Sequence, residues 1–146
     1  MFISRKRYNE LIRLSFFDEA TGFYNRNWFE KHYIQHFQRG TMSLAVIDIN
    51  NLKTTNDNHG HWKGDILIQQ IGKKLSNYST VVRWGGDEFF CIIKDKKMFA
   101  ELCKNQDDFA YAYKFDFDCK DIKDVVVELD KQMYDCKKSQ KRTNKE

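Results

Sequence analysis

Hydrophobic residues in the N-terminal part of the chain recur at helical spacing. Residues 5–16 alternate apolar and basic side chains in a way that predicts a short amphipathic helix. A second helix is expected after the turn at Thr21-Gly22, with Asn25 as its N-cap. Its apolar stripe would be formed by Phe29, Tyr33 and Phe37. These two helices would precede the first strand of the fold.

The middle of the chain begins with a continuous apolar run. Residues 44–47 are all apolar and the run stops at Asp48, as expected of a strand that is buried on both faces. The polar, glycine-containing stretch over 50–65 is predicted to be a loop. A helix would then begin near Asp65 and end near Tyr78.

A hairpin is the strongest short-range signal in the second half. Two β-rich runs, 80–84 and 87–93, flank Gly85-Gly86, and this arrangement favours a β-hairpin. The remaining elements are a short helix at 97–104, a strand at 109–117 and a final helix with an apolar stripe from Ile122 to Cys136. We therefore expect an α/β (α+β) domain in which helices pack over a central, largely antiparallel sheet.

The composition fits one folded domain. Of 146 residues, 41% are hydrophobic and 15% are aromatic, which is enough to bury a core and excludes a disordered chain. No apolar stretch approaches the roughly 20 residues that span a bilayer. The N-terminus turns basic before an apolar run develops, so neither a membrane span nor a signal peptide is expected.

Charge bears on the possible partners of the protein, and cysteine content predicts a cytoplasmic location. The net charge of +4 comes with basic residues gathered at both ends, a feature of proteins that bind nucleic acid or anionic membranes. Solvated tails are the simpler interpretation, so no nucleic-acid partner is expected. The four cysteines fit neither close pairing nor a zinc finger, which favours free thiols in a reducing compartment (Cys91, Cys103, Cys119 and Cys136).

Three carboxylates stand out because they occur where strands end or turn. Asp48 follows the buried run, and Asp87 and Glu88 come directly after Gly85-Gly86. Taken alone, the Gly-Gly pair could simply be a hairpin turn with its acids facing solvent. If hairpin and strand are neighbours, however, the acids converge, and they are then costly to ionise unless a cation lies between them. Mg²⁺ is the expected cation, since it prefers oxygen ligands and shares its shell with substrate phosphates.

Four segments carry a family resemblance, and the most specific is Gly85-Gly86-Asp87-Glu88-Phe89. The others are residues 18–26, similar to D-x-L-T-G-L-x-N-R, residues 48–65, similar to D-I-D-x-F-K-x-x-N-D-x-x-G-H-x-x-G-D, and residues 129–138, similar to A-D-x-A-M-Y-x-A-K-K. In this order they resemble the GGDEF family of diguanylate cyclases. The resemblance implies a polymerase-palm-like nucleotidyl cyclase fold for residues 18–146, preceded by an N-terminal helix over residues 1–17.

The resemblance also implies a reaction and a metal site. Two GTP molecules would be condensed into cyclic di-GMP by attack of a ribose 3′-hydroxyl on an α-phosphate, at a head-to-head homodimer. Asp48, Asp87, Glu88 and the Ile49 carbonyl would bind Mg²⁺ or Mn²⁺, which would lower the pKa of the hydroxyl. Asp87 and Glu88 would act in catalysis, and which acid is the base is left open.

By the same resemblance, a second group of residues would bind the substrate. Asn56 and Asp65 match the positions that read guanine, whose N1–H and N2–H can donate to a carboxylate. An ordinary N-cap is the alternative interpretation of Asp65. The triphosphate would be held by Lys53, by the backbone amides of Asn51 and Leu52, and by Lys137 and Lys141.

The sequence departs from the family pattern at several places. Asn50 replaces the second aspartate of D-I-D, so the site carries one negative charge fewer. The family's product-inhibition motif, R-x-x-D, would fall at residues 76–79, where serines replace both charged residues, so feedback at that site is not expected. Only residues 1–17 precede the domain, and no sensor domain is expected to arrange the dimer. Arg26 is expected to be a structural partner for a loop carboxylate.

Two alternative functions stay open. A catalytically silent GGDEF domain could bind GTP or a cyclic dinucleotide as an interaction module, and the short segment between the signature and the final helix favours this. The intact metal acids favour the active enzyme instead. A related cyclase with a different base choice is disfavoured by Asp65.

Overall fold

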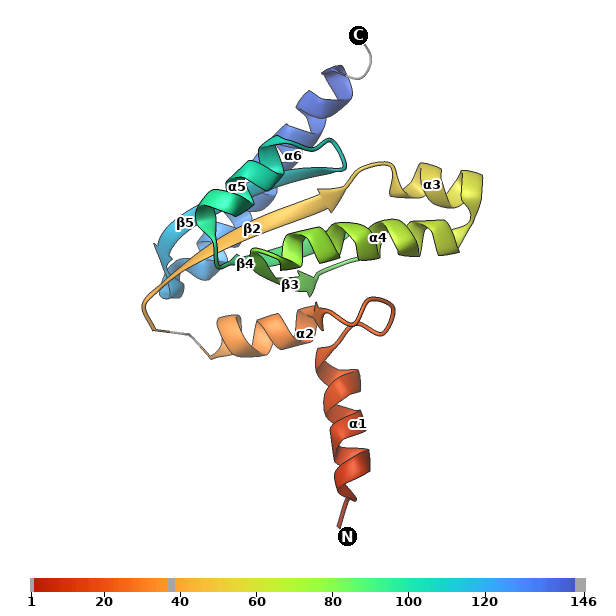
Figure 1. Ribbon diagram of the computed structural model, residues 1–146. Coiled ribbons are helices and arrows are strands. Elements are labelled where there is room, and N and C mark those ends of the chain that lie inside the picture. The colour runs from red at the N-terminus through yellow and green to blue at the C-terminus, as the bar shows by residue number, and fades with distance from the viewer. Residues whose placement is uncertain (1, 37–38, 144–146) are drawn as a thin grey trace.

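A five-stranded sheet forms the centre of the computed structural model, which describes residues 2–36 and 39–143. The strand order is β1-β3-β4-β2-β5 (Figure 1). The strands are β1 (Tyr24–Asn25), β2 (Thr41–Ile49), β3 (Ser79–Arg83), β4 (Glu88–Ile93) and β5 (Phe109–Asp118). β1 pairs with β3 in parallel, whereas β3 with β4, β4 with β2, and β2 with β5 are antiparallel. The largely antiparallel sheet and the hairpin are therefore confirmed.

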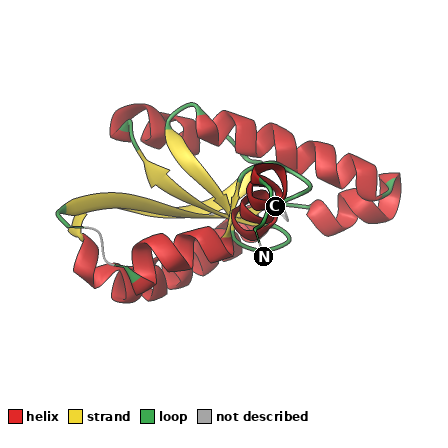
Figure 2. Ribbon diagram, turned by 90° about the horizontal axis from the view of Figure 1, so that it is seen from below, coloured by secondary structure: helices red, strands yellow, loops and turns green. Residues whose placement is uncertain are grey.

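Helices cover both faces of the sheet (Figures 1 and 2). They are α1 (Arg5–Phe16), α2 (Arg26–Phe29), the π-helix η1 (Glu30–Gln35), α3 (Leu52–His59), α4 (His61–Ser76), α5 (Lys96–Lys104), the 3₁₀ turn η2 (Cys119–Asp121) and α6 (Ile122–Thr143). Side chains of α2 and α6 share one buried cluster with the sheet, and those of α4 and α5 share the other. Among the residues described, no helix combines the length and the apolar character needed to cross a membrane.

The central strand β2 is apolar on both faces because both faces are covered. Leu44 and Val46 belong to the cluster that includes α6, whereas Ala45 and Ile47 belong to the cluster that includes α4. This alternation follows from the two-residue period of a strand. It confirms the expected strand and places Asp48 on the same side of the sheet as α6.

The prediction of a loop over residues 50–65 is wrong. This segment contains α3 and the beginning of α4, which are separated by Gly60 at a φ of +84°. No residue of α3 is buried, so the segment lacks the apolar stripe from which a helix can be recognised. Asp65 consequently lies inside α4 rather than at its start, and its interpretation as an N-cap is wrong.

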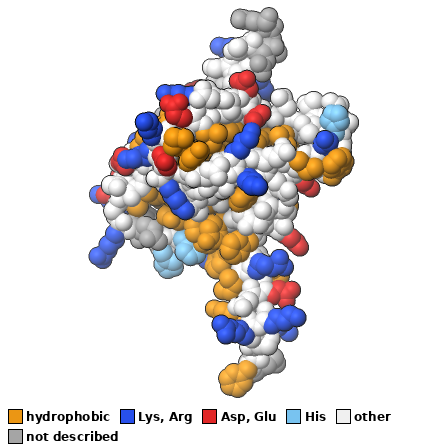
Figure 3. Space-filling model, viewed as in Figure 1, with side chains coloured by type: hydrophobic (Ala, Val, Ile, Leu, Met, Phe, Trp, Pro, Cys, Tyr) orange, Lys and Arg blue, Asp and Glu red, His pale blue; other side chains and the backbone are white. Residues whose placement is uncertain are grey.

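The N-terminal elements largely follow the sequence pattern. The predicted helix over residues 5–16 is confirmed as α1, which extends away from the body of the domain and has no buried residue (Figures 1 and 3). Asn25 caps α2, with its Oδ1 accepting from the Trp28 amide at 3.0 Å. Phe29 is fully buried, and the predicted stripe residue Phe37 lies outside the described residues.

Candidate active site

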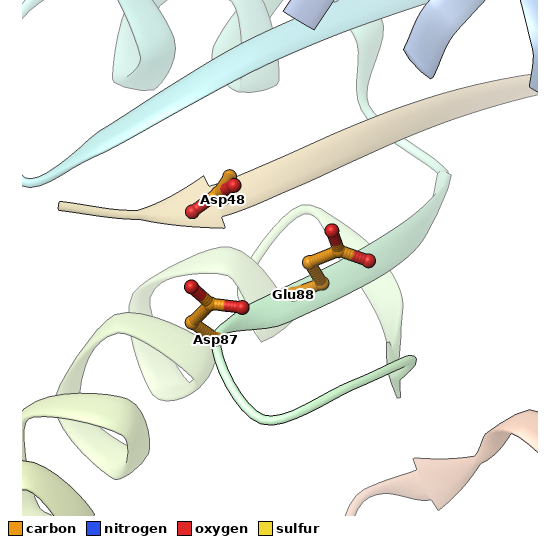
Figure 4. Close-up of side chains that lie close together, drawn as sticks. All are labelled: Asp48, Asp87 and Glu88. Atoms are coloured by element: carbon orange, nitrogen blue, oxygen red, sulfur yellow. The ribbon is translucent and has the colours of Figure 1, made fainter. Parts of the chain in front are cut away.

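Strand pairing brings together the three acids that the sequence singles out. Asp48 of β2 lies directly opposite Glu88 of β4, and Asp87 immediately precedes β4. The Ile49 amide donates to the Asp87 carbonyl at 2.8 Å, which ties the end of β2 to the hairpin turn. One carboxylate oxygen from each acid lies within 4.8 Å of the other two (Figure 4).

The surroundings of these carboxylates oppose their ionisation. Asp48 is only 7% exposed, and burial raises its pKa; a hydrogen bond from Lys137 opposes this effect, and the nearby charge of Asp87 reinforces it. Burial likewise raises the pKa of Glu88, and the charges of Asp48 and Asp87 add to the rise. Burial also raises the pKa of Asp130, whose charge acts on Glu88 as well. An added cation would relieve this repulsion.

The donor set fits a hard divalent cation. All three side chains offer oxygen atoms, and these are close enough together to share one ion or a pair of ions. The carboxylates are partly desolvated, so their affinity for a cation is greater than that of acids spread over an exposed surface. Mg²⁺ or Mn²⁺ therefore suits the site, whereas the role of the Ile49 carbonyl as a further ligand stays a prediction.

A pocket of about 430 Å³ opens beside Asp87. Its lining includes four residues expected to bind the nucleotide, namely Leu52, Lys53, Asn56 and Asp65. Arg83 and Gly86 from the hairpin complete the wall next to the acid. The corrected helical structure of residues 52–65 explains this grouping, because α3 and α4 pack against each other and present Asn56 and Asp65 to one space.

Asn56 has an unusual environment within the pocket wall. Its Oδ1 is buried without a hydrogen-bond partner, and it is the one such side-chain atom found in the part of the chain that the structure describes. The backbone of Gly64 lies directly against this oxygen, and a Cβ there would overlap with it. A buried polar group left unpaired costs free energy, so this amide is better satisfied by a ligand's donor than by the protein alone.

The remaining predicted substrate residues gather on the α6 side of the acids. Asn51, Lys137 and Lys141 line a small pocket of about 60 Å³ together with Asn50 and Gln140. The Lys137 ammonium donates to Asp48 Oδ1 at 2.9 Å. The charge of Lys141 also lowers the pKa of Asp48. The predicted site residues thus form two groups, one lining the pocket beside Asp87 and one lining the small pocket next to α6.

Arg83 is a site residue that sequence reasoning missed. Its guanidinium donates to the Gly85 carbonyl at 3.2 Å and to the Gly86 carbonyl at 2.9 Å, and it lies 3.1 Å from Asp18 Oδ2. It therefore holds the turn that carries Asp87. The expectation that Arg26 binds a loop carboxylate is wrong, because Arg26 pairs at 2.9 Å with Glu30, the first residue of η1. For Arg83, the available signal in the sequence was a basic residue at the end of the strand that precedes Gly85-Gly86.

Asn50 stands where the family has an aspartate, and the structure shows that its side chain has a structural role that the sequence did not reveal. Its side-chain amide donates to the Asp107 carbonyl at 3.0 Å and to Gln140 Oε1 at 2.9 Å. Gln140 in turn donates to the Phe109 carbonyl at 3.1 Å. This arrangement, the Asn50–Gln140 clip, fastens α6 to the loop that follows the first acid.

Known proteins resemble this chain in sequence. The family model described as "Diguanylate cyclase, GGDEF domain" matches residues 15–107. The chain is 32% identical over 101 residues to diguanylate cyclase DgcS of Shewanella oneidensis, a match that covers 63% of this chain and 34% of DgcS. It is 37% identical over 87 residues to diguanylate cyclase VdcA of Vibrio cholerae, covering 56% of this chain and 26% of VdcA. The chain thus spans about a third or less of the length of these relatives.

A solved structure shares the fold. Diguanylate cyclase SiaD, crystallised in complex with its activator SiaC from Pseudomonas aeruginosa, matches with a TM-score of 0.72 at 21% identity. The match covers 92% of this chain and 63% of the other. The polymerase-palm-like fold that the sequence motifs imply is therefore that of the described structure.

Proposed function

The chain belongs to the GGDEF domain family of diguanylate cyclases, and on this premise we propose that it condenses two GTP molecules into cyclic di-GMP. Each ribose 3′-hydroxyl would attack the α-phosphate of the other nucleotide. The observation that carries the proposal is the convergence of Asp48, Asp87 and Glu88 beside a pocket lined by Asn56 and Asp65.

The three acids would hold Mg²⁺ or Mn²⁺, together with the Ile49 carbonyl. Bound there, the metal would lower the pKa of the attacking hydroxyl and offset charge on the phosphate oxygens. Asp87 and Glu88 are the acids nearest the hairpin turn, and we propose them as the groups that receive the hydroxyl proton. Burial raises the pKa of Glu88, which makes its carboxylate a stronger proton acceptor than an exposed one.

The two groups of polar residues would divide the nucleotide between them. Asp65 would accept from guanine N1–H and N2–H, and Asn56, whose buried oxygen lacks a partner, would take a further donor. The triphosphate would be held by Lys53, by the backbone amides of Asn51 and Leu52, and by Lys137 and Lys141. Adenine lacks the donors that Asp65 requires, which makes GTP the proposed substrate.

The product contains two nucleotides, whereas one set of acids and one base pocket would serve one GTP. We therefore propose a head-to-head homodimer in which each chain presents its nucleotide to the other. The proposed compartment is the cytoplasm, where the substrate GTP is available and where the four free thiols would stay reduced.

Product analysis tests the proposal. Purified protein is incubated with GTP, ATP or both in the presence of Mg²⁺ or Mn²⁺, and products are identified by mass. Cyclic di-GMP is expected from GTP, and Asp87→Ala and Glu88→Ala should each lower its rate of formation by more than about 100-fold. Glu101→Ala, an exposed acid on α5, is the matched control and should leave the rate unchanged. Binding of GTP with no product under any condition would leave the alternative of a silent binding module.

A further inference from the structure

Lys137 forms an ion pair with Asp48, one of the three acids of the proposed metal site. Its ammonium lies 2.9 Å from Asp48 Oδ1, and the side chains of the pair are 28% and 9% exposed. In every other ion pair among the described residues, the acidic side chain is more exposed than that of Asp48. The lowest of these exposures is the 24% of Asp18. The protein therefore supplies an internal positive charge to the most buried acid of the proposed metal site.

An ammonium and a divalent ion compete for this carboxylate. Both bind carboxylate oxygens, and two cations held a few ångströms apart in a partly desolvated site repel each other. Either the metal binds weakly while Lys137 stays, or the Lys137 ammonium moves away. The lysine side chain is long and flexible enough to do so without movement of its helix.

A small pocket beside Lys137 offers its side chain another place to go. Lys137 also lines the small pocket shared with Asn51 and Lys141, next to the end of β2. The helix that carries Lys137 is held in place by the Asn50–Gln140 clip, so the side chain alone needs to move. Phosphate oxygens in this pocket would attract the ammonium as strongly as a carboxylate does.

We propose that Lys137 is an exchangeable counterion that pairs with Asp48 in the free protein and transfers to the nucleotide's phosphates when substrate binds. The proposal rests on the function proposed above. Two consequences follow. Lys137 weakens the binding of divalent metal in the absence of nucleotide, and it makes metal and nucleotide bind cooperatively, because the nucleotide removes the competitor of the metal.

Binding of Mn²⁺ alone tests the first consequence. Free Mn²⁺ is measured by electron paramagnetic resonance in titrations of the wild-type protein, Lys137→Met and Lys137→Gln, with folding checked by circular dichroism. Both variants should bind Mn²⁺ about tenfold more tightly than wild type, on the scale of removing one like charge at short range. Lys138→Met is the matched control, because it removes the same charge from a neighbour whose ammonium lies over the Tyr134 ring, 4.5 Å from its centroid. It should leave the affinity unchanged.

The second consequence is tested by repeating the titrations with guanosine 5′-[α,β-methylene]triphosphate. The nucleotide should tighten Mn²⁺ binding more in wild type than in Lys137→Met, and chelation by the nucleotide in solution is common to both proteins. Equal Mn²⁺ affinity of wild type and folded Lys137 variants, or equal coupling to the nucleotide, would overturn the inference while leaving the proposed function standing. Absence of Mn²⁺ binding in all variants, with and without nucleotide, would overturn the metal site on which both depend.

Discussion

At the scale of single residues, burial and mutual repulsion both oppose the ionisation of the site carboxylates, and burial has the larger effect. Asp48 and Glu88 face each other across adjacent strands, and like charges directly opposite destabilise a sheet. Lys137 offsets only part of the combined effect of burial and repulsion, since the pKa values of both acids remain raised. The fold carries this cost at the place where a cation can offset it, which is typical of sites arranged for function.

The raised pKa of Glu88 predicts how stability depends on pH without metal. The folded protein holds this proton to higher pH than the unfolded chain, so stability falls as pH rises above the ordinary value of 4.5. Glu88→Gln removes the effect and should gain stability relative to wild type as pH rises from about 4 to about 7, by up to about 1 kcal/mol given partial exposure. Urea unfolding in EDTA measures this, with Glu101→Gln as control. A difference that stays constant with pH would contradict it.

Gly64 gives a second prediction at this scale. A Cβ at this position would overlap with Asn56 Oδ1, so Gly64→Ala should displace the Asn56 amide from the pocket wall. Affinity for GTP, measured by calorimetry, should fall about tenfold or more, as expected when a buried polar contact to a base is lost. The helix should tolerate the change, because alanine favours a helix interior by about 1 kcal/mol over glycine.

Lys63→Ala, at the exposed neighbouring position, is the control for this variant and should bind GTP like wild type. Unchanged affinity in Gly64→Ala would show that Asn56 takes no part in nucleotide binding.

At the scale of elements, the sequence predicted what depends on local periodicity. β2, the hairpin of β3 and β4, and the stripe of α6 have apolar patterns that specify both element and buried face. The failure at α3 has a physical cause, since a short helix with no buried residue has no apolar stripe to recognise. Its helicity depends on packing against α4, which only the folded chain provides.

Some contacts of the candidate site could likewise be predicted from the sequence, and others could not. Asp87 and Glu88 are neighbours in a signature, and their meeting with Asp48 needs only one correct strand pairing. The contacts of Lys137 with Asp48 and of Asn50 with Gln140 join distant parts of the chain through the docking of α6. Side-chain pairing of this kind is set by the tertiary arrangement, so no local pattern could have revealed it.

The Asn50–Gln140 clip yields a prediction about α6. In Asn50→Asp a carboxylate would face the Asp107 carbonyl and Gln140 Oε1, and it can donate to neither. Rotation of the Gln140 amide would not repair this, because its nitrogen already donates to the Phe109 carbonyl. Asn50→Asp should therefore destabilise the protein by about 1 kcal/mol, because the hydrogen bonds that it removes are exposed or partly buried.

Thermal unfolding in EDTA measures the loss, and hydrogen exchange should show faster opening at the C-terminal end of α6. A double variant with Gln140→Ala should lose less than the sum of the single changes. Full additivity would show that the two side chains act independently.

At the scale of the whole molecule, the proposed reaction requires two chains. In the proposed homodimer, each chain would contribute one set of acids and one pocket, and the two sets would meet around two nucleotides. α1 has apolar side chains that are about half exposed, namely Tyr8, Leu11 and Leu14. They leave apolar surface that a second chain could contact. Activity is therefore expected to be a property of the pair, with a rate per molecule that rises with protein concentration.

Mixing active and inactive chains distinguishes a paired site from a self-sufficient one. Glu88→Ala chains should still associate with wild-type chains, and each mixed pair would lack one competent set of acids. The test uses concentrations at which the protein is almost entirely dimeric, and a fixed amount of wild type. Adding an equal amount of Glu88→Ala should lower the rate of cyclic di-GMP formation to about half, because half of the wild-type chains are then in mixed pairs. The same addition of Glu88→Ala in a monomeric mechanism would leave the rate unchanged. Mass analysis of the mixed sample should also reveal a linear dinucleotide, because the one competent site in a mixed pair can form a single phosphodiester bond and cannot close the ring.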